Sequence, residues 1–327
     1  MSYILVDTAN TFFRARHVIN GDADMKLGMA FHITLNGVKK AWKDFEGKHV
    51  IFFLEGRSWR KDFYPPYKRN RSEARAAHTA KEAEEEKLFW EAFDTFKEFI
   101  SEKTNCTVLQ HPQLEADDLI AGWIQNHPND DHVIISTDTD FVQLIAPNVK
   151  QYNGITDVTI THEGYFDHKG KPVKDKKTGE AKAVPVPEWL LFEKCMRGDP
   201  TDNVFSAYPG VRTKGSSKKV GLTEAFADRN EKGFAWNNMM LQRWTDHEGV
   251  EHRVMEDYQR NRVLVDLTAQ PADIRELINT AIAEGAKPKE VTQVGIRLLK
   301  FCQLYDLQKI ADQAQAYAEP LNAKYPS

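Results

Sequence analysis

Four short apolar runs punctuate the first 140 residues of the chain. Each is rich in β-branched or aromatic residues and lacks the 3.6-residue period of a helix, which is typical of a buried strand. The runs lie at residues 3–6, 50–54, 106–109 and 133–135. They predict four strands that are buried on both faces of a sheet.

Helical patterns fill the intervals between these runs. Residues 27–45 carry apolar side chains at three- and four-residue spacing. The clearest helix begins at Thr79, where Glu82 completes a capping box, and keeps one apolar face to Ile100. A further helix starts near Glu115. Strands that alternate with helices predict an α/β fold with a mainly parallel central sheet flanked by helices.

The pattern changes after Tyr152. Residues 167–185 are rich in Gly, Pro and Lys and predict an exposed loop or hairpin. The chain from Pro187 onward is mostly helical in pattern, with stretches at 189–196, 222–227, 254–267, 274–283 and 291–317. We expect an α/β domain over residues 1–194 and a smaller, mainly helical C-terminal domain over residues 195–327.

Composition excludes several classes of protein. The 327 residues are 41% hydrophobic and 28% charged, as in ordinary globular chains. Three widely spaced cysteines, Cys106, Cys195 and Cys302, predict neither a disulfide framework nor a zinc site. The start lacks a basic leader, and no run approaches the roughly 18 apolar residues of a membrane span. We therefore expect a cytoplasmic monomer without membrane contact, in the host cytoplasm if the chain is phage-encoded.

Acidic residues follow each predicted strand. The carboxyl ends of parallel strands share one edge of a sheet, where ligands bind, so we expect these side chains to gather there. A turn of sequence Gly-Asp-Pro-Thr-Asp-Asn at residues 198–203 contributes two more acids. The full set, in chain order, is Asp7, Glu55, Glu115, Asp117, Asp118, Asp138, Asp140, Asp199 and Asp202.

So many neighbouring carboxylates need a compensating charge. Each like-charged pair at about 4 Å costs roughly 4 kcal/mol at an effective dielectric constant near 20. Oxygen ligands select hard cations, so we expect Mg²⁺, with Mn²⁺ as a substitute. Two ions about 4 Å apart could share Asp138, one activating water and the other stabilising the leaving oxygen. Taken alone, each acidic group is more often a helix cap, a turn or a polar strand end, but acids at four strand ends together favour a site.

Charge is distributed unevenly outside this acidic set. The net charge is −4. Without the nine acids, 39 of the 48 acidic residues remain against 44 Lys and Arg, so the rest of the chain is mildly basic. Residues 57–71 hold six of these cations, interleaved with four aromatic side chains, a combination that single-strand binders use. A solvated loop with its aromatics packed inward is the alternative. A second basic stretch, residues 214–219, is expected to hold a phosphate through its lysines and backbone amides, or to be a flexible surface loop.

Taken together, these motifs resemble the 5′-nuclease (flap endonuclease) superfamily, and within it the phage-type ribonuclease H branch of 5′→3′ exonucleases. The resemblance covers roughly residues 1–267. It rests on the acids named above, on the Trp59-Arg-Lys-Asp-Phe and Tyr67-Lys-Arg-Asn-Arg segments, and on the Arg260-Asn-Arg-Val-Leu-Val-Asp-Leu segment. The resemblance implies a PIN-like 5′-nuclease fold, with a basic arch or bridge within about residues 57–87 through which a single strand passes.

The resemblance also implies roles for individual residues. Asp7, Glu55, Asp117 and Asp138 resemble ligands of a first metal ion, direct or through water. The second-metal group would be Asp140, Asp199 and Asp202, while Glu115 and Asp118 support the motif or bind metal themselves. Lys68 and Arg71 would contact the scissile phosphate and act with Asp138 in catalysis, and Tyr67 would stack on the terminal base. The implied nucleic-acid contacts are Arg60, Lys61, Tyr67, Lys68, Arg69, Arg71, Lys214, Lys218 and Lys219.

Two positions depart from the family pattern. Glu55 stands where relatives often have Asp, and its extra methylene favours contact with a metal through water. The Gly-Ile-Gly-x-Lys loop of the family's helix–turn–helix is replaced by Pro209-Gly-Val-Arg-Thr-Lys-Gly-Ser-Ser-Lys-Lys. This replacement puts duplex binding and a potassium site in that loop in doubt.

The resemblance implies an activity and its partners. We expect a Mg²⁺-dependent 5′→3′ exonuclease with flap endonuclease and ribonuclease H activity that removes RNA primers and adjacent DNA during lagging-strand replication. Its substrates would be DNA and RNA–DNA hybrids with a free 5′ end or a 5′ flap. Residues 291–317 would dock a single-strand-binding protein or a sliding clamp, or simply pack in the core.

Two other functions remain alternatives at this point. A haloacid-dehalogenase-like phosphatase also uses acids at strand ends, but needs a second acid two residues after Asp7, where Ala9 stands. A non-catalytic DNA-junction-binding protein of the same fold would usually have lost several of the carboxylates.

Overall fold

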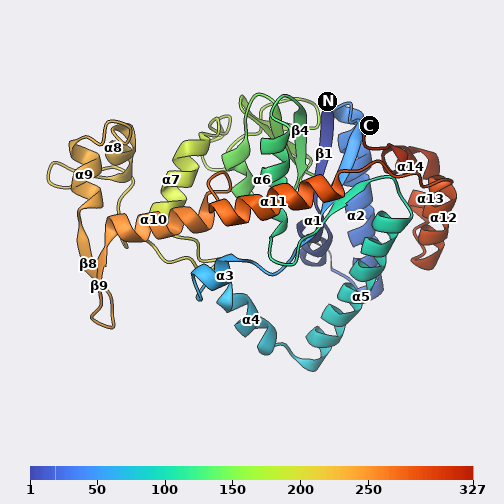
Figure 1. Ribbon diagram of the computed structural model, residues 1–327, viewed down its shortest axis with the longest axis horizontal. Helices are drawn as coiled ribbons and strands as arrows, with labels where there is room; N and C mark the ends of the chain where they lie inside the picture. Colours follow the sequence, from blue (N-terminus) through green and yellow to red (C-terminus); the bar gives the residue numbers. More distant parts are fainter. Residues whose placement is uncertain (19, 327) are drawn as a thin grey trace. The chain divides into compact units, whose positions relative to one another are not determined.

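The chain folds into two compact units, each assembled from segments that are distant in the sequence (Figure 1). A computed structural model describes residues 1–18 and 20–326. The first unit comprises Met1–Ser58, His78–Pro185 and Ala272–Ser327, and the second comprises Trp59–Ala77 and Val186–Pro271. The last 56 or so residues therefore pack with the strand-bearing unit, whereas the sequence pattern grouped them with the helical C-terminal domain.

A seven-stranded sheet of order β3-β2-β1-β4-β5-β6-β7 lies at the centre of the first unit. Pairing is parallel from β3 through β5 and antiparallel for β6 and β7. The mainly parallel sheet is thereby confirmed. It also contains β5, β6 and β7, beyond the four strands that the sequence pattern predicted. The strands are β1 (Ser2–Asp7), β2 (His49–Phe53), β3 (Thr107–Leu109), β4 (Asp131–Ile135), β5 (Val149–Asn153), β6 (Val158–Thr161) and β7 (Gly164–Asp167).

The register brings the carboxyl ends of four strands to one edge. Asp7 is paired with Phe53, and Phe53 in turn with Leu109. On the other side of β1, Val6 is paired with Ile135. The residues that directly follow β1, β2, β3 and β4 therefore begin at the same edge of the sheet, as the sequence analysis predicted.

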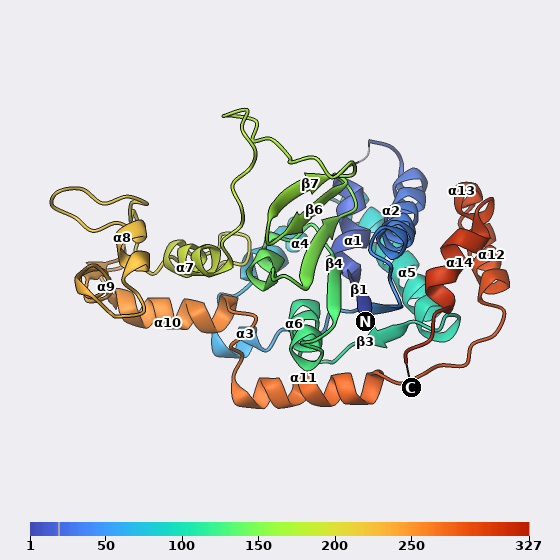
Figure 2. The ribbon, with the colours of Figure 1, turned by 90° about the horizontal axis from the view of Figure 1, so that it is seen from above.

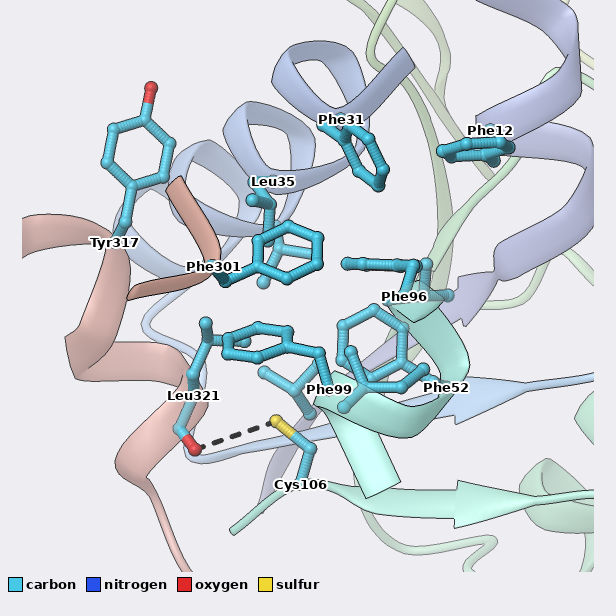
Figure 3. Packing of buried hydrophobic residues seen from close by; sticks show 14 of the residues in the cluster. Phe12, Phe31, Leu35, Phe52, Phe96, Phe99, Cys106, Phe301, Tyr317 and Leu321 are labelled. Atoms are coloured by element: carbon cyan, nitrogen blue, oxygen red, sulfur yellow. Dashed lines mark hydrogen bonds between the residues drawn. The ribbon is translucent and has the colours of Figure 1, made fainter. Parts of the chain in front are cut away.

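One face of the sheet supports the largest hydrophobic core of the unit (Figure 3). Successive side chains of a strand point to opposite faces, and Ile4, Val6, Val50 and Phe52 share this one. Phe96 lies between the sheet and the helices, with its ring centroid 6.0 Å from those of both Phe52 and Phe301. The helices that cover this face are α1 (Thr8–Arg14), α2 (Ala23–Asp44), α5 (Ala80–Glu102), α12 (Val294–Leu304), α13 (Gln308–Ala311) and α14 (Ala314–Asn322).

Two helices cover the opposite face, α6 (Ala116–Asn126) and α11 (Ala272–Gly285) (Figure 2). Trp123 of α6 is fully buried, and its ring lies 5.3 Å from that of Tyr3 and 6.4 Å from that of Phe53. Gly122 allows the two helices to approach closely, since a Cβ atom there would meet Ile278 at 2.1 Å. Two 3₁₀ segments, η1 (Ala15–His17) and η2 (Thr139–Leu144), complete the unit.

Helix α5 begins at the cap that the sequence predicted. Thr79 accepts a hydrogen bond from the Glu82 amide at 3.3 Å, and the Glu82 carboxylate accepts one from the Thr79 amide at 2.8 Å. This capping box begins α5, as predicted. Such a cap contributes about 1 kcal/mol by satisfying amides that have no partner within the helix.

The C-terminal stretch predicted as helical over 291–317 is broken into α12, α13 and α14. Asp306 adopts a left-handed backbone conformation with φ of 51°, which ends α12 before the next helix begins. Val294, Leu298 and Tyr317 belong to the main core. Core packing therefore accounts for the apolar pattern of this stretch, and docking of a replication protein here stays a prediction.

The second unit is mainly helical around a smaller core. Phe192, Met196, Trp236 and Met239 are buried there. A short antiparallel hairpin, with its turn at Asp246–Gly249, was missed because the surrounding pattern is helical. The elements are α3 (Arg60–Phe63), α4 (Arg69–Ala76), α7 (Pro187–Arg197), α8 (Leu222–Ala227), α9 (Phe234–Met240), β8 (Arg243–Thr245), β9 (Glu251–Arg253) and α10 (Val254–Val265).

The three cysteines form no disulfide in the described part of the chain. Cys106, Cys195 and Cys302 are buried free thiols. Among residues 1–18 and 20–326, no helix has the length and apolar character needed to cross a membrane.

Replacing Phe96 by Ala should destabilise the first unit by about 3–5 kcal/mol, because it leaves a cavity between β2 and α12. Leu88→Ala on the same helix removes a side chain that is 41% exposed and serves as the matched control. Urea unfolding followed by circular dichroism measures both. Equal midpoints for the two variants would contradict the placement of Phe96.

Candidate active site

Asp7 is a buried acid at the sheet edge. It ends β1 and is only 5% exposed. The Ser136 hydroxyl, which directly follows β4, donates to Asp7 Oδ2 at 2.7 Å. The Ser136 oxygen also accepts the Asp138 amide at 3.0 Å. One hydroxyl therefore joins the ends of two neighbouring parallel strands and sets the position of the loop that carries Asp138.

Two side chains that the sequence analysis did not single out hold the same loop. The Asn10 amide oxygen accepts the Thr137 amide at 3.0 Å and the Thr137 hydroxyl at 2.9 Å. Gln151 of β5 donates to the carbonyls of Ser136 at 3.1 Å and Asp138 at 2.6 Å. Asn10 follows Asp7 closely enough to have been suspected, but Gln151 becomes visible only when β5 is known to pair with β4.

A second group of acids surrounds the start of α6. Glu115, Asp117 and Asp118 each place a carboxylate oxygen within 4.8 Å of the others. Glu55 joins this group, because its Oε2 accepts the Ala116 amide at 3.1 Å. The Ser58 hydroxyl donates to Glu115 Oε2 at 2.6 Å. Ser58, also missed from the sequence, therefore orients one of the acids.

Asp118 has a mainly local role in this group. It is fully buried, and its Oδ2 accepts the Glu115 amide at 3.2 Å, which closes a capping box. The Asp118 amide in turn bonds to Asp117 Oδ1 at 2.7 Å. These bonds agree with a supporting position for Asp118 and leave the predicted roles of the remaining acids as predictions.

The pKa of Asp7 is raised at this buried, acidic edge of the sheet. Burial in the protein raises this pKa, and the negative charges of Glu55 and Asp138 raise it further, to about 8. The Ser136 hydrogen bond acts in the opposite direction without cancelling the effect. Glu55 and Asp138 therefore each lie close enough to Asp7 to repel its carboxylate, although Asp138 is 131 positions away in the sequence.

The donor set fits a hard divalent cation. Every side chain in the cluster offers carboxylate or hydroxyl oxygen, and the described residues around it contribute no thiol or imidazole to the groups of acids. A cation would relieve the repulsion that raises the pKa of Asp7, since it favours the ionised carboxylate. Asp140 follows Asp138 in η2, where its amide bonds Asp138 Oδ1 at 2.9 Å.

Asp199 and Asp202 belong to the second unit, in a tight turn. Asp199 and Val204 exchange two backbone hydrogen bonds of 2.8 Å. Gly198 has φ of +77°, and a Cβ atom there would lie 2.3 Å from the Val204 carbonyl oxygen, so glycine is required. Burial acts to raise the pKa of Asp199, but hydrogen bonds from Lys194 and Thr201 outweigh it and leave this pKa lowered.

Asp202 organises the basic segment of the same unit. Its carboxylate accepts the Tyr67 hydroxyl at 3.1 Å and lies 3.7 Å from Lys68 Nζ, and Arg71 forms an ion pair with its other oxygen. The Asp202 carbonyl accepts the Lys68 amide at 2.8 Å, and Lys68 has a left-handed backbone with φ of 55°. The turn therefore positions the two cations that were predicted to contact phosphate.

Two of the predicted nucleic-acid contacts are buried instead. Arg60 is 1% exposed, its guanidinium lies over the Trp59 ring, and its Nε donates to the Leu264 carbonyl at 2.8 Å. Tyr67 is 3% exposed and packs with Cys195 and Leu264. Both side chains hold the basic segment against α10, so contact of Arg60 with phosphate and stacking of Tyr67 on a base are not supported.

The second basic stretch surrounds a cavity of about 700 Å³, lined by Lys214, Lys218 and Lys219 among others. The Gly215 and Gly221 amides both donate to Glu224 Oε2 at 2.9 Å. The Gly215 amide is therefore engaged within the loop, and phosphate binding by other backbone amides of residues 214–219 stays a prediction. The lysines remain the candidate contacts.

Comparison with known proteins identifies the family. Residues 2–171 match the family described as 5′-3′ exonuclease, N-terminal resolvase-like domain. The chain belongs to this family. Ribonuclease H of Enterobacteria phage T4 is 31% identical over 254 residues, which cover 71% of this chain and 72% of that protein. The predicted resemblance to the 5′-nuclease superfamily is thus confirmed.

Two further relatives show how much of a longer protein the chain matches and which fold it shares. DNA polymerase I of Rhizobium leguminosarum is 29% identical over 229 residues, which are 69% of this chain but only 19% of that longer protein. The D15 flap endonuclease of bacteriophage T5, solved with DNA and metal ions, covers 96% of this chain and 100% of its own, with a TM-score of 0.55 and 21% identity. This likeness confirms the exonuclease fold. The family assignment also sets aside the phosphatase alternative.

Because burial and neighbouring acids raise the pKa of Asp7 to about 8, the folded protein binds a proton there that the unfolded chain releases near pH 4. Stability from this group is complete below pH 4 and is lost as pH rises to 8, by up to about 1.4 kcal/mol per pH unit. Thermal unfolding at several pH values in EDTA should show this loss of stability. In Asp7→Asn, stability should change less with pH.

Asp94 is an exposed acid of α5, and Asp94→Asn is the control for this measurement. Its stability should depend on pH as in the wild type. Excess Mg²⁺ should also flatten the wild-type profile, since a bound cation favours the ionised carboxylate. If stability in EDTA depended on pH equally in wild type and Asp7→Asn, the raised pKa of Asp7 would be wrong.

Proposed function

We propose that this exonuclease-family chain is a Mg²⁺-dependent 5′→3′ exonuclease with flap endonuclease and ribonuclease H activity. Its role would be to remove RNA primers and adjacent DNA during lagging-strand replication. The observation that carries the proposal is the gathering of acids from four strand ends at one edge of the sheet, where burial and the charges of Glu55 and Asp138 raise the pKa of Asp7. Ribonuclease H of phage T4 and flap endonuclease Xni of Aeromonas salmonicida carry matching activities in their names.

The acids divide into two proposed groups. Asp7, Glu55, Asp117 and Asp138 would hold a first Mg²⁺, and Ser136 and Asn10 would keep Asp7 and the Asp138 loop in place. Asp140, Asp199 and Asp202 would hold a second ion, an assignment that rests on the family resemblance. When bound, the two ions would supply an activated water and a counter-charge for the leaving oxygen, and Mn²⁺ would substitute for Mg²⁺. Hydrolysis would leave a 5′-phosphate and a 3′-hydroxyl.

Lys68 and Arg71 are proposed to bind the scissile phosphate. Asp202 holds both side chains from one turn, and the Arg71 side chain is 53% exposed and so accessible to a strand. A phosphate gains negative charge in the transition state, and positioned cations are worth most at that point. Arg69 and Lys61 would follow the backbone of the same strand, in keeping with their position on the basic segment.

The loop that contains Lys214, Lys218 and Lys219 is proposed to contact the phosphates of the duplex. Its cavity is open and its lining carries several cations. Contacts of this kind position a duplex without reading its sequence, as expected for an enzyme that recognises an end or a flap. The DNA complex of the T5 flap endonuclease supports a DNA substrate for this fold.

Changing Asp138 to Asn or Asp117 to Asn should lower Mg²⁺-dependent cleavage of a 5′-labelled flap by at least about 100-fold, since each change removes a charge that holds a cation. Asp175→Asn, in an exposed loop of the same unit, should keep the wild-type rate. Product lengths on flap, nicked and RNA-primed duplexes would separate the three proposed activities.

Wild-type rates for both site variants would refute the hydrolytic site. Binding of the flap with no turnover in Mg²⁺ or Mn²⁺ would instead favour the non-catalytic junction-binding alternative.

Arg71→Ala should lower the single-turnover cleavage rate by roughly 100-fold, because it removes a cation from the reacting phosphate. Flap affinity, measured by fluorescence anisotropy in Ca²⁺, should change by less than about fivefold. Lys87→Ala on α5, a side chain that is 76% exposed, is the control. An equal loss of affinity and rate would assign Arg71 to general strand binding only.

A further inference from the structure

A buried amide side chain contacts the loop that carries Asp138. Gln151 belongs to β5, which pairs with β4 on one side and with β6 on the other. Its side chain is only 2% exposed and lies on the face of the sheet opposite to that of Tyr152, which packs in the main core. A central strand that is buried on both faces usually carries apolar residues at such positions. Core packing therefore does not explain why this residue is polar.

The Gln151 amide is committed to the loop. Its Nε2 atom donates to the carbonyl oxygens of Ser136 at 3.1 Å and Asp138 at 2.6 Å, which uses both of its N–H groups. Its Oε1 atom is shielded from solvent and has no hydrogen-bond partner within residues 1–18 and 20–326. A buried acceptor without a partner lowers stability. The side chain is thus placed for its two donors, and its role lies in the backbone that they hold.

These two bonds complete the fixation of Asp138. The Asp138 amide donates to Ser136 Oγ at 3.0 Å, and its carbonyl accepts from Gln151. The Asp140 amide donates to Asp138 Oδ1 at 2.9 Å. The other carboxylate oxygen, Oδ2, accepts no hydrogen bond from the part of the chain that the structure describes. The carboxylate is therefore held through its backbone and through Oδ1, and Oδ2 is left to face a cation.

Cations differ in how much such fixation matters. Mg²⁺ requires near-ideal octahedral geometry and short distances to its oxygen ligands, whereas Ca²⁺ accepts more ligands in a flexible arrangement. Residues that hold a metal ligand in place commonly change the affinity for the metal by about 10- to 100-fold. A carboxylate that is free to shift would therefore lose affinity for Mg²⁺ before it loses affinity for Ca²⁺.

We propose that Gln151 is a positioning residue that gives the proposed metal site its preference for Mg²⁺ over Ca²⁺, because it fixes the loop from which the Asp138 carboxylate projects. This inference rests on the proposed function, in which Asp138 holds a cation. Gln151 acts through the Ser136 and Asp138 carbonyls rather than as a ligand. Its loss therefore changes the choice between the two ions and not only the strength of binding.

Thermal unfolding of the full chain at increasing MgCl₂ or CaCl₂, at constant ionic strength, tests this inference without any substrate. The rise in Tm with metal concentration gives an apparent Kd for each ion, since a ligand that binds the folded state stabilises it. Gln151→Met keeps the length of the side chain but removes both donors. We expect its apparent Kd to rise by at least about tenfold for Mg²⁺ and by less than about threefold for Ca²⁺.

Two further variants separate positioning from general destabilisation. Gln151→Asn retains the amide but is one methylene shorter, so it cannot reach both carbonyls. It should behave like Gln151→Met, and it decides the outcome if Gln151→Met does not fold. Val149→Ala removes buried apolar atoms from the same strand and is the control. It should lower the Tm in EDTA but leave the apparent Kd for each ion within about twofold of wild type.

Equal weakening of Mg²⁺ and Ca²⁺ binding in the Gln151 variants would overturn the inference, because general disruption of the site weakens both ions alike. An unchanged apparent Kd for Mg²⁺ would also overturn it, while leaving the metal site proposed for Asp138 intact. If the wild-type Tm rose with neither ion, the proposed metal site would fail and the inference with it.

Discussion

The repulsion among carboxylates at one edge of a parallel sheet is the constraint on which the rest of the site depends. Asp7, Glu55 and Asp138 arrive there because β1, β2 and β4 run in the same direction and in register. Folding buries Asp7 and brings the charges of Glu55 and Asp138 close to it, and burial first and this repulsion second raise the pKa of Asp7 to about 8. A divalent cation would relieve that repulsion. The clustered carboxylates that destabilise the metal-free fold are therefore also the groups that would bind the metal.

The surrounding polar side chains keep this strained group in one geometry. Ser136 joins the ends of β1 and β4, Gln151 holds the Asp138 loop from β5, and Ser58 orients Glu115. Supports of this kind matter because a metal site tolerates small errors in position poorly. The family's sequence motifs name the acids, but these neutral residues decide where the acids point.

In the second unit an acid and its cations restrain each other. Asp202 gathers Lys68, Arg71 and the Tyr67 hydroxyl, and Gly198 gives its turn the required left-handed bend. Arg60 and Tyr67 contribute by burial, which makes them the structural base of the segment whose outer side would meet nucleic acid. The same basic sequence thus divides into side chains that hold the segment and side chains that remain available to a strand.

The sequence by itself determined the α/β class, the four central strands, the capped helix at Thr79 and the identity of the clustered acids, because each follows from local period, capping chemistry or strand-end position. Tertiary structure alone decided the roles of Arg60, Tyr67, Ser58 and Gln151, since burial and cross-strand neighbours have no local signature. It also decided that residues 272–285 cover the sheet through α11 and that β5, β6 and β7 extend the sheet beyond the four predicted strands. The physical reason is the same in each case: contacts between residues far apart in the chain are set by packing, which a single sequence does not display.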